Sequence, residues 1–419
     1  MKVLHLATSD SIGGAARAAY RQHQALQSVG VESRMLVRHK HTNDPQVHAF
    51  AGRRNLSSRL ERTLRRVWIN RREQKSRAKN RYGLVDPRAD LLRSMVPEMA
   101  DADVINLHKT EHFVDVPALL AALPDNKSVV VTLHDLSPLT GGCDYPGNCA
   151  KFIQSCGCCP VLGSGTDKDF SREIFRLRQA AYHSRRPEKF AFVANSRWTL
   201  DNIKRSGLTA NRRAELIHLA FDNNAYKPIN QAVAREALGI RPDAAVICFA
   251  AHDLSLPHKG GAQLLVALTG LKLDRPVHLL TMGSSHFSPP PNFRHTHFGR
   301  LDSDTLQAVI YSAADVFVIP SMEEAFGQTA LEAAACGAVI AGFAVGGILD
   351  IVQDGLNGRL VSRGDTEALQ NAICDLLKNA ARRTHWRTIC HDWVAGRFSF
   401  ALNANAYRSL YESLLNNGT

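Results

Sequence analysis

Residues 315–342 read DVFVIPSMEEAFGQTALEAAACGAVIAG, and the order of their apolar and polar segments decides the fold. An apolar run at 315–319 ends at a proline, a helical pattern follows at 328–335, and a second apolar run occupies 338–342. A strand, a loop, a helix and a strand in this order predict one step of a parallel sheet. Glu324 lies in the loop and Glu332 one turn into the helix. Helix capping is one interpretation of these acids, and a bound ligand is the other.

The same alternation continues along nearly the whole chain and predicts an α/β fold. Ten short runs are rich in Val, Ile, Leu and Ala, as strands buried on both faces of a parallel sheet are. The predicted strands are 3–7, 35–38, 103–107, 129–133, 190–194, 215–219, 246–250, 278–282, 315–319 and 338–342.

Turn-forming residues cluster at 221–231 and indicate a boundary between two domains. We therefore expect Rossmann-like domains at 1–224 and 225–399, with a final helix at 400–419 that packs back on the first domain. Parallel sheets of two such domains would face each other across a cleft, and ligands of these folds bind at strand ends and helix N-termini.

The composition is that of a globular protein: of 419 residues, 45% are hydrophobic and 21% are charged. The start MKVLHLATSD alternates like a strand and does not resemble a signal peptide, and no apolar run is long enough to span a bilayer. We expect a cytoplasmic protein whose nine cysteines stay reduced.

Three loops in the first half carry polar residues directly after predicted strands. Gly13 and Gly14 precede a helix and permit close approach of a ligand to the backbone, although an ordinary turn explains them equally well. His108 follows one strand, and His134 with Asp135 follows another. Two histidines on nearby strands favour a site that holds a sugar or moves a proton, whereas a single one is more often structural.

Five of the nine cysteines fall between 143 and 159, after His134 and Asp135. Cys143, Cys149, Cys156 and Cys159 have the order C-x5-C-x6-C-x2-C, in which one tetrahedral zinc ion could be held. Only the last pair has the usual zinc-knuckle spacing. Disulfides are the rival interpretation, which a reduced cytosol disfavours, and in either case the cluster staples the loop. A catalytic thiol is disfavoured because nothing in this stretch lowers the pKa of a cysteine.

In the second half, Lys259 stands beside Gly260 at a predicted helix start, a combination that suits a diphosphate, although most lysines are merely exposed. Arg300 follows a short strand. The backbone N–H groups of Phe326 and Gly327 would point to the same space as Glu324.

These motifs together resemble the retaining family 4 glycosyltransferases of the GT-B type. The resemblance lies in the E-x7-E pair Glu324 and Glu332 and in GRLDS, DVFVIPS and GFAVGGILDIVQDGLNG around it. It extends to SIGGAARAAYRQHQAL, DVINLH, TLHD, VANS and Lys259-Gly260, and so covers nearly the whole chain. The segment TLHDLSPLTGGCDYPGNC…GCCP looks like that of enzymes that build colanic acid and other bacterial exopolysaccharides.

The resemblance implies a UDP- or GDP-sugar donor, no catalytic metal, and a growing, lipid-linked oligosaccharide as acceptor. It implies that Glu332 holds the ribose, that Glu324 holds the transferred sugar, and that Lys259 neutralises the diphosphate. Backbone N–H groups at Gly13, Gly14, Phe326 and Gly327 would assist. His108 and His134 would touch the reacting sugar, and Asp135, Asn195 and Ser196 would lie on the acceptor side.

One position departs from the family pattern. Family members carry an arginine shortly before the lysine, but residues 250–254 read AAHDL here. His252 and His258 are the candidate replacements.

The formal charge of +12 is concentrated in residues 53–81, which hold twelve Arg or Lys and two Glu. Leucines at 56, 60 and 64 with Val67 share one helical face, the pattern of an amphipathic helix on anionic lipid. Peripheral binding to the inner face of the plasma membrane is one interpretation, and a solvated insertion is the other.

Two rival functions remain: a GT-B-fold sugar-nucleotide epimerase and a zinc-stabilised nucleic-acid-binding protein. The E-x7-E pattern argues against the epimerase. The glycine loops and paired glutamates are unexplained by nucleic-acid binding, so no nucleic-acid partner is expected.

Overall fold

The computed structural model describes residues 1–50, 63–64, 67, 71, 84–89 and 98–416. The chain divides into two compact units, which we call unit 1 (Met1–His218 and Asn403–Thr419) and unit 2 (Leu219–Leu402). The boundary therefore lies at 218/219 and not at the expected 224/225. The reason is local: the last strand of unit 1 ends early, at Leu216, and the Phe221 N–H already donates to the Phe398 carbonyl of unit 2 at 3.2 Å.

Unit 1 is built on a sheet of seven strands in the order β3-β2-β1-β4-β5-β6-β7. Every neighbouring pair is parallel, so all carboxyl ends lie at one edge of the sheet. The strands are β1 (Lys2–Ser9), β2 (Glu32–His39), β3 (Val47–Ala49), β4 (Val104–Leu107), β5 (Ser128–Thr132), β6 (Phe190–Ala194) and β7 (Arg213–Leu216).

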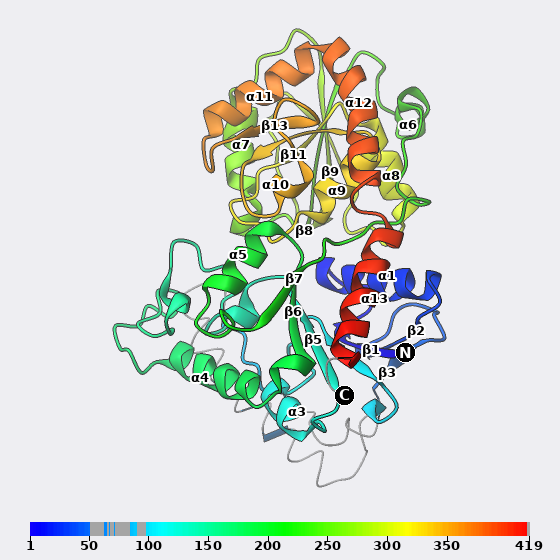
Figure 1. Ribbon diagram of the computed structural model, residues 1–419. Helices are drawn as coiled ribbons and strands as arrows, with labels where there is room; N and C mark the ends of the chain where they lie inside the picture. The colour runs from blue at the N-terminus through cyan, green and yellow to red at the C-terminus, as the bar shows by residue number, and fades with distance from the viewer. Residues whose placement is uncertain (51–62, 65–66, 68–70, 72–83, 90–97, 417–419) are drawn as a thin grey trace. The chain divides into compact units, whose positions relative to one another are not determined.

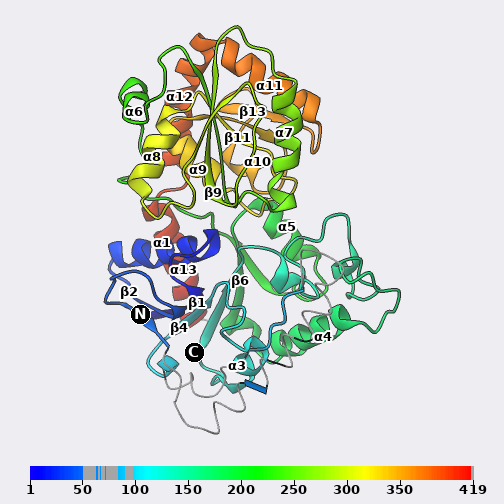
Figure 2. The ribbon, with the colours of Figure 1, turned by 180° about the vertical axis from the view of Figure 1, so that it is seen from behind.

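Helices cover both faces of this sheet because alternate strand residues point to opposite faces (Figures 1 and 2). On one face, Val3, Val104 and Val130 pack with Leu26 of α1 (Gly14–Ser28) and with the last helix, α13 (Phe400–Asn416). On the other face, a second cluster includes residues of α3 (Val116–Ala122), α4 (Phe170–His183) and α5 (Arg197–Arg205). Short 3₁₀ helices lie at Ser137–Leu139, Lys151–Ile153 and Pro187–Lys189.

The C-terminal helix packs on unit 1 through the spacing read from the sequence. Tyr407, Leu410, Tyr411 and Leu414 are all buried in the same cluster as β1 and β4. The Tyr411 hydroxyl also accepts hydrogen bonds from Asn106 Nδ2 at 2.8 Å and from Gln22 Nε2 at 3.0 Å, so its polar end is satisfied within the core.

Unit 2 contains a six-stranded parallel sheet in the order β10-β9-β8-β11-β12-β13. Helices α8, α9 and α12 pack together, and α7 packs on α11 (Figure 1). The strands are β8 (Ala245–Asp253), β9 (Val277–Ser284), β10 (Arg294–His297), β11 (Val316–Ile319), β12 (Val339–Phe343) and β13 (Gly358–Val361). The helices are α6 (Gln231–Ala237), a 3₁₀ turn at Pro257–Lys259, α7 (Gly261–Thr269), α8 (Asp304–Ala313), α9 (Gln328–Ala335), α10 (Ile348–Ile351), α11 (Thr366–Lys378) and α12 (Ala380–Ala395).

The predicted α/β class with two parallel sheets is confirmed, and each of the ten predicted runs overlaps a strand. The run expected at 215–219 is shifted, since β7 spans Arg213–Leu216. Three edge strands, β3, β10 and β13, lie outside the ten predicted runs, although a short strand before Arg300 was expected where β10 lies. An edge strand needs no continuous apolar run.

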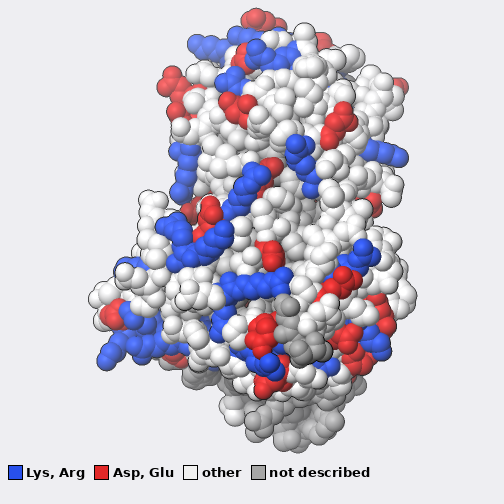
Figure 3. Space-filling model, viewed as in Figure 1, with Lys and Arg blue, Asp and Glu red and all other residues white. Residues whose placement is uncertain are grey.

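The basic segment 53–81 lies outside the described residues except at 63, 64, 67 and 71. On the face shown in Figure 3, the described Lys and Arg side chains are interspersed with Asp and Glu. Within the described part of the chain, no helix combines the length and the apolar character needed to cross a bilayer.

Candidate functional site

A lysine–glutamate pair lies at the carboxyl edge of the unit 2 sheet. Lys259 ends the 3₁₀ turn that follows β8, and Glu324 lies in the loop between β11 and α9. Lys259 Nζ is 2.6 Å from Glu324 Oε2, with only 18% and 11% of the two side chains exposed. Ser321 Oγ donates to the same oxygen at 3.4 Å. Two residues that the sequence assigned separately to one ligand are therefore brought together.

Glycines hold the loops around this pair in close contact. Gly260 has φ +74°, and a Cβ placed there would be 1.7 Å from the Pro320 carbonyl oxygen. A Cβ on Gly346 would be 1.8 Å from the Glu324 carbonyl oxygen, and the Gly347 N–H donates to that oxygen at 3.0 Å. Only glycine permits such approach, so these positions fix the backbone on which Glu324 is carried.

Glu332 lies inside α9 with 3% of its surface exposed. The Tyr311 hydroxyl donates to its Oε2 at 3.4 Å, a partner from α8 that the sequence did not suggest. Gly327, with φ +104°, directly precedes α9, and Phe326 is buried with its ring 5.7 Å from that of Phe398. A buried carboxylate at this edge is a strong hydrogen-bond acceptor, as a sugar hydroxyl requires.

The two histidines proposed in place of the missing arginine are poor cations. Burial lowers the pKa of His258 to about 4, with Lys259 lowering it further and Glu324 opposing. Burial also lowers the pKa of His252, and the next contribution comes from Arg300. Both imidazoles are thus biased toward the neutral form at neutral pH, whereas Arg300 is a permanent cation close enough to act on His252.

In unit 1, three histidines form a hydrogen-bonded chain: His5 lies within β1, and His108 and His134 follow the ends of β4 and β5. His5 Nδ1 lies 2.9 Å from His108 Nε2, and His108 Nδ1 lies 3.0 Å from His134 Nε2. Burial, followed by the neighbouring histidines, lowers the pKa of His108 well below its usual value, and burial lowers that of His134 to about 4. The three rings are therefore neutral at pH 7. His5 was not predicted as a site residue because it lies within an apolar strand.

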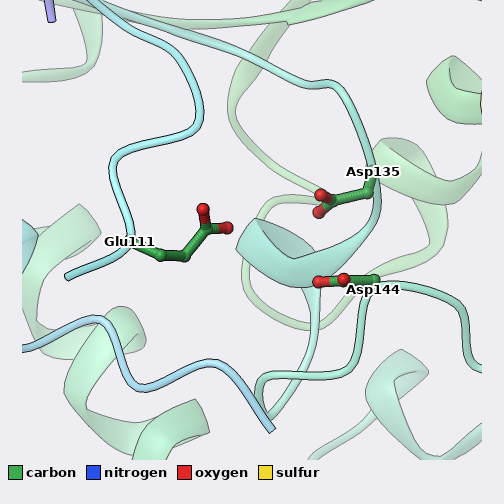
Figure 4. A group of neighbouring side chains, drawn as sticks. All are labelled: Glu111, Asp135 and Asp144. Atoms are coloured by element: carbon green, nitrogen blue, oxygen red, sulfur yellow. The ribbon is translucent and has the colours of Figure 1, made fainter. Parts of the chain in front are cut away.

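Next to this chain, Lys109 lies among three carboxylates. Its Nζ forms an ion pair with Asp135 and is 3.0 Å from Glu111 Oε1 and 3.5 Å from Asp144 Oδ1. Figure 4 shows the three carboxylates converging on a common space, and their oxygens lie within 4.8 Å of one another. The Lys109 ammonium supplies the positive charge there. The sequence did not predict a site at Lys109, Glu111 and Asp144, because no glycine motif and no repeat marks these positions.

Lys109, Glu111 and Asp135 line a solvent-open cavity of ≈ 570 Å³ in unit 1, and Asp144 approaches Lys109 from outside that lining. Burial and the Asp135 carboxylate raise the pKa of Asp144 to about 7, with Lys109 opposing. Burial acts against the ionised form of Asp135 too, but Lys109 and hydrogen bonds from Ser137 keep its pKa below the usual value. The cavity lining includes Asp86, His108, Lys109, Glu111, His134, Asp135 and Arg178.

The remaining predicted site residues of unit 1 have local structural contacts. Gly13 precedes α1 with φ +91°, and Gly14 is the first residue of that helix. Ser196 caps α5 by accepting from the Thr199 N–H at 3.1 Å, and Asn195 Oδ1 accepts from Thr199 Oγ1 at 2.9 Å. Asn195 and Ser196 are 1% and 0% exposed, and neither is among the residues that line the cavity beside Lys109.

Four cysteines of the loop after β5 line a second cavity in unit 1, of ≈ 350 Å³. They are Cys143, Cys149, Cys156 and Cys159, the four that the spacing singled out. Among the described residues, no three of their Sγ atoms lie within 4.8 Å of one another, so the loop does not present a closed tetrahedral site. Burial raises the pKa of Cys143 to about 12 and that of Cys156 to about 11, which argues against a catalytic thiolate.

Part of the second unit is similar in sequence to sugar-transferring enzymes. Residues 244–379 match the family described as glycosyl transferases group 1. D-inositol 3-phosphate glycosyltransferase from Segniliparus rotundus is 30% identical over 246 residues, which cover 55% of this chain and 54% of that protein. The Mycobacterium marinum protein of the same name is 32% identical over 188 residues, covering 40% of this chain and 38% of that protein. The chain thus spans about half or less of these relatives.

Solved structures share the fold over the whole chain. Sucrose-phosphate synthase from Thermosynechococcus elongatus has a TM-score of 0.69 at 19% identity, with 100% of both chains covered. HepE from Anabaena, in complex with UDP-glucose, has a TM-score of 0.65 at 18% identity, covering 98% of this chain and 100% of that one. The two parallel α/β units therefore have the GT-B architecture, and residues 244–379 of unit 2 carry the sequence pattern of the glycosyl transferases group 1 family.

Proposed function

We propose that the protein is a retaining glycosyltransferase of family 4 that transfers a sugar from a UDP- or GDP-sugar. The observation that carries this proposal is the Lys259–Glu324 pair, 2.6 Å apart at the carboxyl edge of the unit 2 sheet. It lies within the residues that match glycosyl transferases group 1. A lysine and a carboxylate side by side offer one cation for a diphosphate and one acceptor for sugar hydroxyls.

Within unit 2, each polar group has a proposed part. Lys259 binds the diphosphate, Glu324 binds the sugar that is transferred, and Glu332 binds the ribose. The backbone at Phe326 and Gly327 approaches the same ligand. When the donor arrives, the diphosphate competes with Glu324 for the Lys259 ammonium and frees the carboxylate for the sugar. Departure of the sugar then develops charge on the phosphate, which a fixed cation stabilises.

Arg300 is the proposed second cation at the diphosphate, in place of His252 and His258. Its guanidinium remains charged at every physiological pH, and it already influences His252. An imidazole with a lowered pKa offers no lasting charge. Of these residues, we therefore expect Arg300→Gln to weaken donor binding at neutral pH more than His258→Gln.

In unit 1, the cavity beside His108, His134 and Asp135 is the proposed acceptor region. The neutral imidazoles can donate to or accept from a hydroxyl, and Gly13 and Gly14 are proposed to approach the donor. Asn195 and Ser196 are proposed to stand on the acceptor side, behind the surface, since both are buried and Ser196 caps α5. The acceptor is proposed to be a growing, lipid-linked oligosaccharide of an exopolysaccharide or other cell-surface polysaccharide.

The acidic cluster favours a neutral or basic glycan in this cavity over a phosphorylated one. Glu111, Asp135 and Asp144 surround one lysine, so their charge is only partly compensated. A phosphate ester placed there would be repelled. The curated relatives act, by their name, on D-inositol 3-phosphate, and this cluster is the reason that we do not propose the same acceptor here.

Peripheral attachment through residues 53–81 to the inner face of the plasma membrane is also proposed, since that segment alone carries ten net positive charges. Its test is co-sedimentation with vesicles of anionic or neutral lipid at two salt concentrations. Binding only to anionic vesicles, weakened by salt, is expected. Binding to neither kind of vesicle, or equally to both, would contradict the attachment.

The donor assignment is tested by thermal-shift measurements with UDP-, GDP-, ADP- and dTDP-sugars. We expect one nucleotide class to raise the melting temperature, and Glu332→Ala to abolish that rise. Glu323→Ala is the matched control, because Glu323 neighbours Glu324 but pairs with Arg363 at 3.3 Å. If Glu332→Ala responds to the donor as the wild type does, the ribose assignment is wrong. NMR of the transferred product then tests retention, since inversion of the anomeric centre would contradict family 4 chemistry.

A further inference from the structure

The cysteine loop of unit 1 plays no part in the proposed transfer and has a chemistry of its own. We propose that Cys143, Cys149, Cys156 and Cys159 together bind one zinc ion, which holds the loop after β5 in place. The function would be structural and independent of any catalytic metal. Zinc bound by four thiolates at ~2.3 Å is the common form of such structural sites.

The first observation is that the fold gathers these four side chains around a single cavity. They come from three separate turns of the loop, yet all four line the same ≈ 350 Å³ space, together with Phe152 and Gly157. All four members of one spacing pattern therefore face a single space.

The second observation is the backbone around the sulfurs. The Gly141 N–H donates to Cys156 Sγ at 3.1 Å. A backbone N–H directed at a sulfur donates a charge-assisted hydrogen bond once that sulfur is a metal-bound thiolate. Such outer contacts orient a metal ligand.

The fifth cysteine of the loop provides the contrast. Cys158 lies between two of the proposed ligands in sequence, but its backbone has φ +42° and its Sγ is directed to the Gly165 carbonyl oxygen at 3.6 Å. It is not part of the cavity lining. The left-handed backbone at this residue turns its side chain away from the other four, so the structure separates ligands from the non-ligand within a Cys158-Cys159 pair.

Binding requires a local closure of the loop. Since no three of the sulfurs lie within 4.8 Å of one another, the side chains must rotate toward the centre of the cavity when the metal enters. Zn²⁺ replaces four S–H protons, which pass to the buffer, and no oxidant or reductant is needed. A closed site would fix Asp144, which follows Cys143 and whose carbonyl accepts from the Leu136 N–H at 2.9 Å.

The test begins with the metal content of the full-length protein, purified under reducing conditions without chelators. Mass spectrometry of the elements should find one zinc per chain. Removal of the zinc by a chelator should lower the melting temperature, and added Zn²⁺ should restore it. A protein that contains no zinc and is not stabilised by added Zn²⁺, or that carries disulfides among these cysteines, overturns the proposal.

Two single variants in the same loop form a matched pair. Cys149→Ser changes a half-buried proposed ligand, and Cys158→Ser changes the excluded cysteine. We expect at least a 10-fold loss of zinc affinity for Cys149→Ser and none for Cys158→Ser. Equal losses, or retention of zinc by both, would show that the four assigned ligands are wrong.

A spectroscopic measurement on the wild type avoids any dependence on folding of the variants. The zinc-free protein is titrated with Co²⁺, whose tetrahedral thiolate complexes absorb strongly in the visible range. We expect saturation at one equivalent, with four thiols protected from an alkylating reagent while Cys158 stays reactive. A weak octahedral spectrum, or protection of fewer than three thiols, counts against the site.

Discussion

Each unit places one lysine against carboxylates at the carboxyl edge of its sheet, but the two arrangements differ in charge and in support. Lys259 faces a single carboxylate, and glycines hold the loops around it within contact distance. Lys109 faces three carboxylates, and 33% of its side chain is exposed. The first arrangement is balanced and rigid, which suits a dianionic diphosphate that displaces one carboxylate. The second is acidic, which suits hydroxyls or amines of a glycan.

The largest expected effect concerns the rigidity of the two edges. Gly260→Ala in unit 2 places a Cβ 1.7 Å from a backbone oxygen at φ +74°, and should cost more than ~3 kcal/mol of stability. Gly13→Ala in unit 1 meets nothing within 4 Å, so only its backbone conformation at φ +91° is penalised, by ~1–2 kcal/mol. Calorimetric melting of both variants measures the difference. Equal losses of stability in the two variants would mean that the backbone at Gly260 is not in close contact with the neighbouring loop.

A second prediction concerns the neutral histidines of unit 1. Burial depresses the pKa of His134 to about 4, so the unfolded chain binds more protons between about pH 4 and 6.5. Stability should therefore fall as the pH decreases from about 6.5 to 4, by up to ~3 kcal/mol from this residue at ~1.4 kcal/mol per pKa unit. Melting temperatures of wild type and His134→Gln across this range give the contribution.

The control variant is His183→Gln. His183 is an exposed residue of α4, and its replacement should give the same dependence of melting temperature on pH as the wild type. A His134→Gln variant as acid-sensitive as the wild type would contradict the neutral, buried chain.

The third prediction compares the lysines directly. Lys109→Met leaves three carboxylates without their cation and should cost ~2 kcal/mol at pH 8, after allowance for the exposure of the lysine. Lys259→Met leaves only Glu324 unpaired and should cost ~1 kcal/mol. The Lys109→Met deficit should shrink toward pH 5 as the carboxylates become protonated. A larger loss for Lys259→Met, or a deficit that does not depend on pH, would contradict the difference in charge.

The difference between the two lysine sites also decides how much of each could be predicted from the sequence. Glu324, Lys259 and their glycines form motifs, because close backbone approach restricts which residues can occupy each position. The order of the strands and the loop that contains residue 144 bring together Lys109, Glu111 and Asp144. Neither of these causes produces a pattern within one short stretch of sequence. His5 was hidden within an apolar strand. Long-range pairing of polar side chains is a property of the folded chain and not of any one segment.

The fold was predictable for a related reason. Central strands such as β5 and β6 are buried on both faces and read as continuous apolar runs. The edge strands β3 and β13 are short and partly exposed, so their sequences resemble loops. The boundary at 218/219 was displaced because it depends on the contact of Phe221 with Phe398, far away in sequence.

The smallest expected effect separates two neighbouring acids of the Lys109 cluster. The pKa of Asp144 is raised to about 7 in the folded protein. In the unfolded chain the same carboxyl ionises at a lower pH, so the folded protein loses stability as the pH rises from about 4 to 7. Because 38% of its side chain is exposed, Asp144→Asn should gain less than ~1 kcal/mol over the wild type at pH 8. Asp135, whose pKa is lowered, should behave oppositely, and Asp135→Asn should lose stability above the pKa of an unfolded aspartate. Urea unfolding of the two variants between pH 4 and 8 gives the two signs. If both substitutions change stability in the same direction, the three carboxylates do not compete for one lysine, and the case for a neutral or basic glycan beside it loses its basis.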